Sequence, residues 1–154
     1  MYADGLTAQT GSVTETFGTG SVTSTIQFKV GNSALSTANQ GGINLDPGGW
    51  SGTYMSGGTI RMYYPTLDLT ITPPSAATYF KFVTGAFNES TVPLNAIAKF
   101  TDGTQASFYV PNATSVDGHT KEVAYTAPAG KTIASVVIPA YSDWYYIDNV
   151  YFET

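Results

Sequence analysis

Residues 96–110 read AIAKFTDGTQASFYV, and this stretch decides the fold class. Both arms are rich in residues that favour β-strands. Asp102-Gly103 lies between them and is a strong hairpin signal, because both residues tolerate the positive φ angles of tight hairpin turns. Pro111 ends the second arm, since proline has no backbone N–H to donate. The stretch therefore predicts an antiparallel hairpin with strands at 96–101 and 105–110.

The rest of the chain repeats this pattern of short strands. Residues 21–30 alternate, with Ile26, Phe28 and Val30 on one face. Further strands are predicted at 59–64, 67–72, 78–83, 121–125, 132–138 and 145–152. No segment has helical periodicity, which excludes parallel units with crossover helices. The chain is therefore predicted to be all-β, an antiparallel β-sandwich of the jelly-roll type.

The length of 154 residues fits one domain, so we expect a single β-sandwich over residues 1–154. The Thr-, Ser- and Gly-rich residues 1–20 are predicted to be an edge strand or a linker remnant. Residues 39–58 (NQGGINLDPGGWSGTYMSGG) contain seven glycines and are predicted to be one long loop. Long loops in compact domains are usually functional or disordered.

Composition and charge exclude several classes of partner. The chain has no cysteine, a net charge of −5 and only 11% charged residues. Its cations are scattered, whereas nucleic acids and anionic membranes attract clustered basic residues. No apolar run approaches the roughly 18 residues of a membrane helix. We therefore expect no nucleic-acid partner and no membrane insertion.

The surface is expected to be polar through Thr, Ser and Tyr, which is typical of extracellular β-proteins. The first residues show no signal-peptide pattern. The chain is therefore interpreted as an excised module or a mature form that carries a start Met, or as a phage or capsule component that uses no signal peptide. We expect a module of a larger multidomain protein, located outside the cell or on its surface.

The C-terminal residues 143–152 read DWYYIDNVYF. Asp148 shares strand phase with Val150 and Phe152, so a core face that bears these two residues would also bear a carboxylate. A buried ionised carboxylate is costly unless it is paired, hydrogen-bonded or bound to a metal. Two interpretations follow: a ligand of structural Ca²⁺, which prefers oxygen ligands, or an Asp that accepts backbone hydrogen bonds at the edge of the sandwich.

This ending, Tyr-Ile-Asp-Asn-Val-Tyr-Phe at 146–152, resembles that of jelly-roll carbohydrate-binding modules with a galactose-binding-domain-like fold. The strand IASVVI at 133–138 and the turn FTDGT at 100–104 are similar to that group as well. The resemblance covers residues 78–154 and indicates no particular family. It implies polysaccharide binding and a structural calcium ion held by a carboxylate such as Asp148. The other ligands would come from near the N-terminus, where Asp4 and Glu15 are the acids, or from a neighbouring loop.

Aromatic side chains are the candidates for sugar contact, because their faces stack on the C–H faces of sugars. Trp50 is surrounded by glycines in the loop 39–58, where a core tryptophan would be unusual, and Tyr54 lies in the same loop. The alternative is that Trp50 folds back as a lid over the end of the sandwich. Trp144 either lines the same rim or packs in the core.

Arg61 is the only arginine, and it shares strand phase with Tyr63. A guanidinium group can bond two hydroxyls at once, so the two residues can form a binding face. The alternative for Arg61 is a surface ion pair with Asp68 or another acid. The alternative for Tyr63, as for Tyr64 and Tyr79, is packing between strands.

Catalysis finds little support in the sequence. The single histidine, His119, lies in a predicted turn, and no Gly-x-Ser-x-Gly motif marks a nucleophile. The carboxylates of Asp46, Asp68 and Asp143 have no spacing that marks a glycosidase pair. We therefore expect no enzymatic activity.

The leading hypothesis is a non-catalytic carbohydrate-binding module that recognises a polysaccharide through loop aromatics. A structural or adhesive surface or phage module with a protein partner is the alternative, and it would show a larger apolar patch than a sugar cleft. A small glycan hydrolase is the second alternative.

Overall fold

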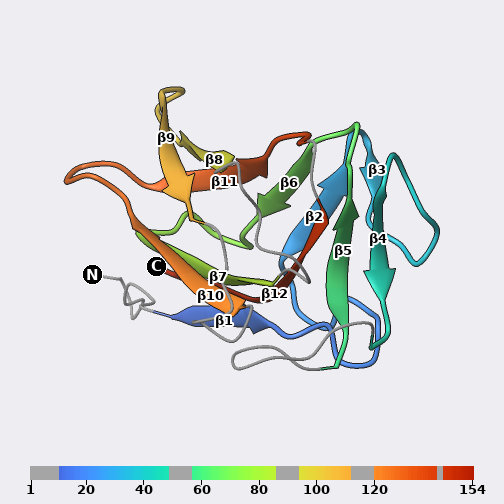
Figure 1. Ribbon diagram of the computed structural model, residues 1–154. Coiled ribbons are helices and arrows are strands. Elements are labelled where there is room, and N and C mark those ends of the chain that lie inside the picture. The colour runs from blue at the N-terminus through green and yellow to red at the C-terminus, as the bar shows by residue number, and fades with distance from the viewer. Residues whose placement is uncertain (1–10, 49–56, 86–93, 112–119, 142–143) are drawn as a thin grey trace.

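The computed structural model describes residues 11–48, 57–85, 94–111, 120–141 and 144–154. These residues form two antiparallel β-sheets (Figure 1), and no helix among them is long and apolar enough to cross a membrane. Sheet A has the order β10 (Thr120–Thr126), β7 (Tyr79–Gly85), β12 (Trp144–Glu153), β5 (Thr59–Tyr63) and β4 (Ile43–Asp46), with β1 (Ser12–Glu15) also paired to β12. Sheet B has the order β3 (Ser33–Ala34), β2 (Gln27–Val30), β6 (Leu69–Thr72), β11 (Ile133–Ile138), β8 (Leu94–Phe100) and β9 (Gln105–Val110).

The core lies between the two sheets and confirms the predicted all-β sandwich. Ile26, Phe28 and Val30 are all buried, as their alternation predicts. Phe80 from sheet A has its ring 4.7 Å from that of Phe152 and 6.4 Å from that of Phe108 of sheet B. Side chains from both sheets therefore fill one continuous hydrophobic cluster.

The hairpin predicted at 102–103 is confirmed. Gly103 has a φ of +88°, and the Asp102 carboxylate accepts a hydrogen bond from the Thr104 N–H at 2.9 Å. Lys131, from the turn before β11, donates to the same carboxylate at 2.6 Å. These hydrogen bonds, that of Lys131 first, hold the pKa of Asp102 well below its ordinary value. The ion pair ties the β8–β9 hairpin to the end of β11.

One predicted segment, the loop 39–58, differs in the structure, and another, residues 1–20, is described in part. The predicted loop 39–58 is interrupted by strand β4, because Ile43 and Leu45 alternate with polar residues and are buried against the core. Within residues 1–20, the part that the structure describes contains β1, which pairs with the end of β12. The expected edge strand is therefore present at residues 12–15.

The predicted phase of Asp148 is wrong. Asp148 pairs with Val83, but Tyr151 pairs with Lys81, so β12 has one residue more than β7 over this interval. Such a β-bulge shifts the alternation of side chains. Asn149 has a φ of +50°, a left-handed conformation that asparagine tolerates better than most residues. Ile147 and Val150 consequently face the core, and Asp148 lies on the opposite side of sheet A.

Glu15 is a fully buried carboxylate at the end of β1. Its two oxygens accept hydrogen bonds from the backbone N–H groups of Phe17, Thr23 and Ser24, at 2.7–2.8 Å. The hydroxyls of Thr23 and Ser24 also donate to it, at 2.7 and 2.8 Å. Burial raises the pKa of Glu15, but these hydrogen bonds outweigh burial and hold the pKa below its ordinary value. The carboxylate thus fixes the turn at 17–24.

We predict that Glu15→Gln lowers the free energy of unfolding at pH 7 by about 2 kcal/mol, because charged hydrogen bonds are replaced by an amide that also presents N–H groups. Since the folded pKa of Glu15 is lowered, its contribution is complete above about pH 4.3 and is lost as the pH falls through the folded value. Urea unfolding at pH 7 and pH 3 should show the gap between wild type and variant closing at pH 3. Glu122→Gln, at an exposed position of sheet A, is the control. An equal gap at both pH values would contradict this role.

Candidate functional site

The outer face of sheet A, turned away from sheet B, gathers aromatic side chains beside the only arginine. Tyr63 of β5 lies directly opposite Trp144 of β12, and Arg61 lies opposite Tyr146. The Tyr63 and Trp144 rings are 5.5 Å apart at 77°, and the Tyr63 and Tyr64 rings are 4.9 Å apart at 88°. These edge-to-face arrangements are favourable for aromatic pairs. We call Arg61, Tyr63, Tyr64 and Trp144 the aromatic cluster.

Within the aromatic cluster, the Arg61 guanidinium stacks on two rings. Its guanidinium carbon lies 4.7 Å from the centre of the Tyr63 ring and 5.7 Å from that of Trp144. Among the described residues no acid is within ion-pair distance of Arg61. Asp68, the pairing partner considered from sequence, instead accepts the Ala140 N–H at 2.8 Å. The guanidinium is therefore held by cation–π contacts, which leave its N–H edge for other partners.

The backbone around the cluster is held in an unusual conformation. Tyr64 has a φ of +44°, which is rare for a residue with a bulky side chain. The Tyr63 N–H donates to Gly42 at 2.8 Å, and a Cβ at Gly42 would collide with the Tyr63 carbonyl oxygen. The turn at 39–42 thus supports the end of β5. Tyr63 and Tyr64 keep 42% and 51% of their surface exposed in this fixed position.

The structure brings together three of the five predicted ligand-binding residues, Arg61, Tyr63 and Trp144. Trp144 is half-buried on the outer face and packs against Tyr146 and Val83, outside the main core. Trp50 and Tyr54, like His119, lie outside the described residues. Tyr64 was expected to pack between strands, but its positive φ turns it out of strand phase and exposes its ring.

Of the three predicted calcium ligands, the structure describes Glu15 and Asp148. Among the described residues no group of three His, Cys, Asp or Glu side chains could hold a metal ion. Glu15 fits poorly, because both its oxygens face N–H and O–H donors. Asp148 is 1% exposed on the outer face and accepts the Asn149 N–H at 2.7 Å. Asp4 lies outside the described residues. The calcium site stays a prediction, with Asp148 as the remaining ligand that the structure describes.

We predict that, if Asp148 ligates calcium, adding Ca²⁺ after chelation raises the melting temperature of the wild type but not of Asp148→Asn. An amide keeps the shape but loses the charge that a hard cation requires. Glu15→Gln is the matched control, because its loss of stability should be the same with and without Ca²⁺. Thermal unfolding in EGTA and in Ca²⁺ is the measurement. An unchanged melting temperature of the wild type would overturn the calcium prediction.

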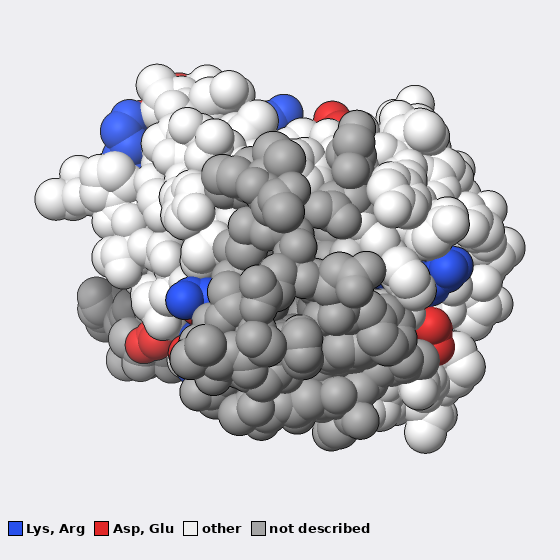
Figure 2. Space-filling view, in the orientation of Figure 1, with Lys and Arg blue, Asp and Glu red and all other residues white. Residues whose placement is uncertain are grey.

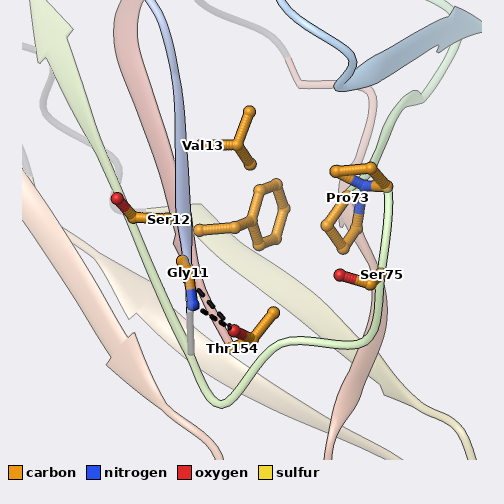
Figure 3. Close-up of a pocket in the computed structure, with 8 residues that line it drawn as sticks. Gly11, Ser12, Val13, Pro73, Ser75 and Thr154 are labelled. Atoms are coloured by element: carbon orange, nitrogen blue, oxygen red, sulfur yellow. Dashed lines mark hydrogen bonds between the residues drawn. The ribbon is translucent and has the colours of Figure 1, made fainter. Parts of the chain in front are cut away.

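A small hollow lies where the chain's two described ends meet (Figure 3). It has a volume of about 140 Å³ and is lined by Gly11, Ser12, Val13, Pro73, Pro74, Ser75, Phe152 and Thr154. Gly11 and Thr154 close one side of it through hydrogen bonds in both directions. The lining is mostly apolar, and no predicted site residue contributes to it. We assign it to packing between β1 and the connection that follows β6.

Comparison with solved structures finds carbohydrate-binding modules. TmCBM61 in complex with β-1,4-galactotriose is 12% identical with a TM-score of 0.49, over 84% of this chain and 89% of that chain. The CBM22-1 xylan-binding domain of Paenibacillus barcinonensis Xyn10C is 10% identical with a TM-score of 0.47, over 96% and 97%. A carbohydrate-binding module of family 29 is 14% identical with a TM-score of 0.40, over 84% and 89%.

No protein-family model matches the chain, and no curated protein matches it. At such identities and TM-scores the similarities do not transfer a binding site or a ligand. The residues on the outer face of sheet A are therefore the basis for assigning a function.

Proposed function

We propose that this protein is a non-catalytic carbohydrate-binding module that recognises a polysaccharide on the outer face of sheet A. The observation that carries the proposal is the aromatic cluster, in which the Arg61 guanidinium stacks on Tyr63 beside two further rings. Aromatic faces bind sugar C–H faces, and a few fixed polar groups set the orientation. The aromatic cluster combines such aromatic rings with one polar group, the Arg61 guanidinium.

The fixed geometry of the cluster supports this function. Arg61 and Tyr63 are on a central strand of the sheet, and Tyr64 is held by a strained backbone. A ligand therefore meets groups whose conformations are already ordered, which lowers the entropy cost of binding. The Arg61 fork donates to two neighbouring hydroxyls of a sugar ring, while Tyr63 and Tyr64 contact its apolar surface.

The proposal includes Trp50 and Tyr54 as further contacts. Their segment leaves β4 after Asp46 and returns to β5 at Thr59, the strand that carries Arg61 and Tyr63. Asp46 pairs with Thr59, so the two ends of this segment lie next to each other at the end of sheet A where β5 begins. We further propose that the module belongs to an extracellular multidomain protein. Only 11% of the residues are charged, and on the face in Figure 2 the described residues show a few separate Lys, Arg, Asp and Glu groups, which suits a ligand without charge.

We predict that Tyr63→Ala weakens polysaccharide binding at least tenfold, because it removes the ring on which both Arg61 and Trp144 pack. Xylan and β-1,4-galactan are the first ligands to test, together with mannan and β-glucan, by isothermal titration calorimetry. Tyr109→Ala is the matched control, since Tyr109 is 57% exposed on β9 of the other sheet. Arg61→Lys should weaken binding as well, because it keeps the charge but loses the planar fork.

Two outcomes would contradict the proposal. Unchanged binding by Tyr63→Ala and Arg61→Lys would place the sugar site elsewhere. Absence of binding to every polysaccharide by the wild type would favour a structural or adhesive module with a protein partner.

A further inference from the structure

A second open region lies on the outer face of sheet A, beside the β-bulge. It is a hollow of about 260 Å³ lined by Thr14, Lys81, Val83, Glu122, Asn149 and Tyr151. These residues come from four neighbouring strands, β1, β7, β10 and β12. None of them belongs to the aromatic cluster. The hollow is larger than the one in Figure 3, and its lining is more polar.

The hollow contains a cation and an anion that are close but not hydrogen-bonded. The Lys81 ammonium and a Glu122 carboxylate oxygen are 3.8 Å apart, beyond the usual range of a hydrogen bond. Both side chains are partly exposed, with 35% and 50% of their surface accessible. Such a loose surface pair contributes little to stability. Each group therefore keeps hydrogen-bonding capacity for a molecule that enters the hollow.

An aromatic side chain forms part of the wall. The Lys81 ammonium lies 5.2 Å from the centre of the Tyr151 ring, and the Tyr79 ring is 6.1 Å from Tyr151. The Tyr151 hydroxyl donates to Glu153 at 3.1 Å, which fixes the position of the ring. The hollow thus combines the apolar surface of an aromatic ring with one hydrogen-bond donor, Lys81, and one acceptor, Glu122.

The β-bulge creates this arrangement. Because β12 has an extra residue after Asp148, Asn149 lies out of register and borders the hollow, while Tyr151 returns to face Lys81. β-Bulges commonly re-aim side chains next to binding sites. The left-handed φ of Asn149 is a second departure from regular strand geometry at the same place.

The hollow and the aromatic cluster share no residue. They meet at Val83, which lines the hollow and packs in one small hydrophobic cluster with Tyr146 and Trp144. Val83 and Tyr146 are only 2% and 3% exposed, so they offer almost no surface to a ligand. Along β12, Trp144 and Tyr151 are seven residues apart, about 20 Å at the rise of a β-strand. One sugar residue cannot contact both places.

We propose that the hollow is a second sugar subsite that takes a single neutral sugar residue. Vicinal hydroxyls would lie between Lys81 and Glu122, one accepting from the ammonium and the other donating to the carboxylate. The opposite charges of Lys81 and Glu122 lie 3.8 Å apart and nearly cancel, so the hollow has no net charge that attracts an ionic ligand, while the pair offers both donors and acceptors to an uncharged polyol. This inference rests on the proposed function and extends it. Two subsites on one face bind one long polysaccharide more tightly than either does alone.

The test is a titration of the ¹⁵N-labelled protein with xylose, galactose, mannose and glucose, followed by amide chemical shifts. We expect at least one sugar to shift the amides of Lys81 and Tyr151. Lys81→Met and Glu122→Gln should weaken that response at least tenfold. Lys29→Met, at an exposed position of β2 in sheet B, is the matched control and should leave the response unchanged.

The variants also separate this inference from the proposed function. Sugar-induced shifts at Arg61 and Tyr63 without shifts at Lys81 and Tyr151 would overturn the second subsite and leave the proposed function in place. No shift at either place with any sugar, together with no binding to polysaccharide, would overturn both. Equal shifts at Lys81 in the wild type and in Glu122→Gln would also overturn the subsite, because the Lys81–Glu122 pair would then play no part.

Discussion

The β-bulge at Asn149 is the constraint on which the rest of the structure depends. Strand β12 pairs with β1, β5 and β7, so it joins the other strands of sheet A. Without the extra residue, the side chains on one side of position 149 would exchange faces. The core would then lose Val150 and Phe152 or receive Asp148. The bulge lets β12 contribute apolar residues to the core at both of its ends, and polar and aromatic residues to the outer face.

Two carboxylates are buried among the described residues, Glu15 and Asp148. The charge of Glu15 is stabilised by residues close to it in the sequence, because Phe17, Thr23 and Ser24 donate hydrogen bonds to its carboxylate. Burying an ionised group is costly unless such donors are present. The turn that they build also supports a neighbouring segment, because Gly58 donates to Gly18 at 2.8 Å and a Cβ at Gly20 would meet Pro47. The Glu15 turn therefore packs against both ends of the segment between β4 and β5.

Sequence reasoning succeeded where strand period and turn chemistry determine the structure. The hairpin at 102–103 follows from two residues that accept positive φ, and the shared face of Arg61 and Tyr63 follows from the regular alternation of β5. It failed at Asp148, because a bulge depends on how two strands pair and not on the period of one. It also missed β4, because only four residues alternate there and glycines flank them on both sides. The sequence does not indicate the role of Glu15, because its hydrogen-bond donors are backbone N–H groups and Thr and Ser hydroxyls, which occur throughout the chain.

The placement of the candidate sites on a sheet, and not only on loops, has a physical consequence. Side chains on paired strands are positioned by the backbone hydrogen bonds of their neighbours, so their spacing is more precise than on a connecting segment. Arg61 and Trp144 lie on adjacent strands in direct register with aromatic partners, and Lys81 and Tyr151 lie in register across β7 and β12. A polymer with a regular repeat gains from two contact places at a fixed separation, because ordering the chain at one place raises its effective concentration at the other. Val83 and Tyr146 are buried on the same face and pack with Trp144 as a second small hydrophobic cluster, so the residues from which both places are built are packed together.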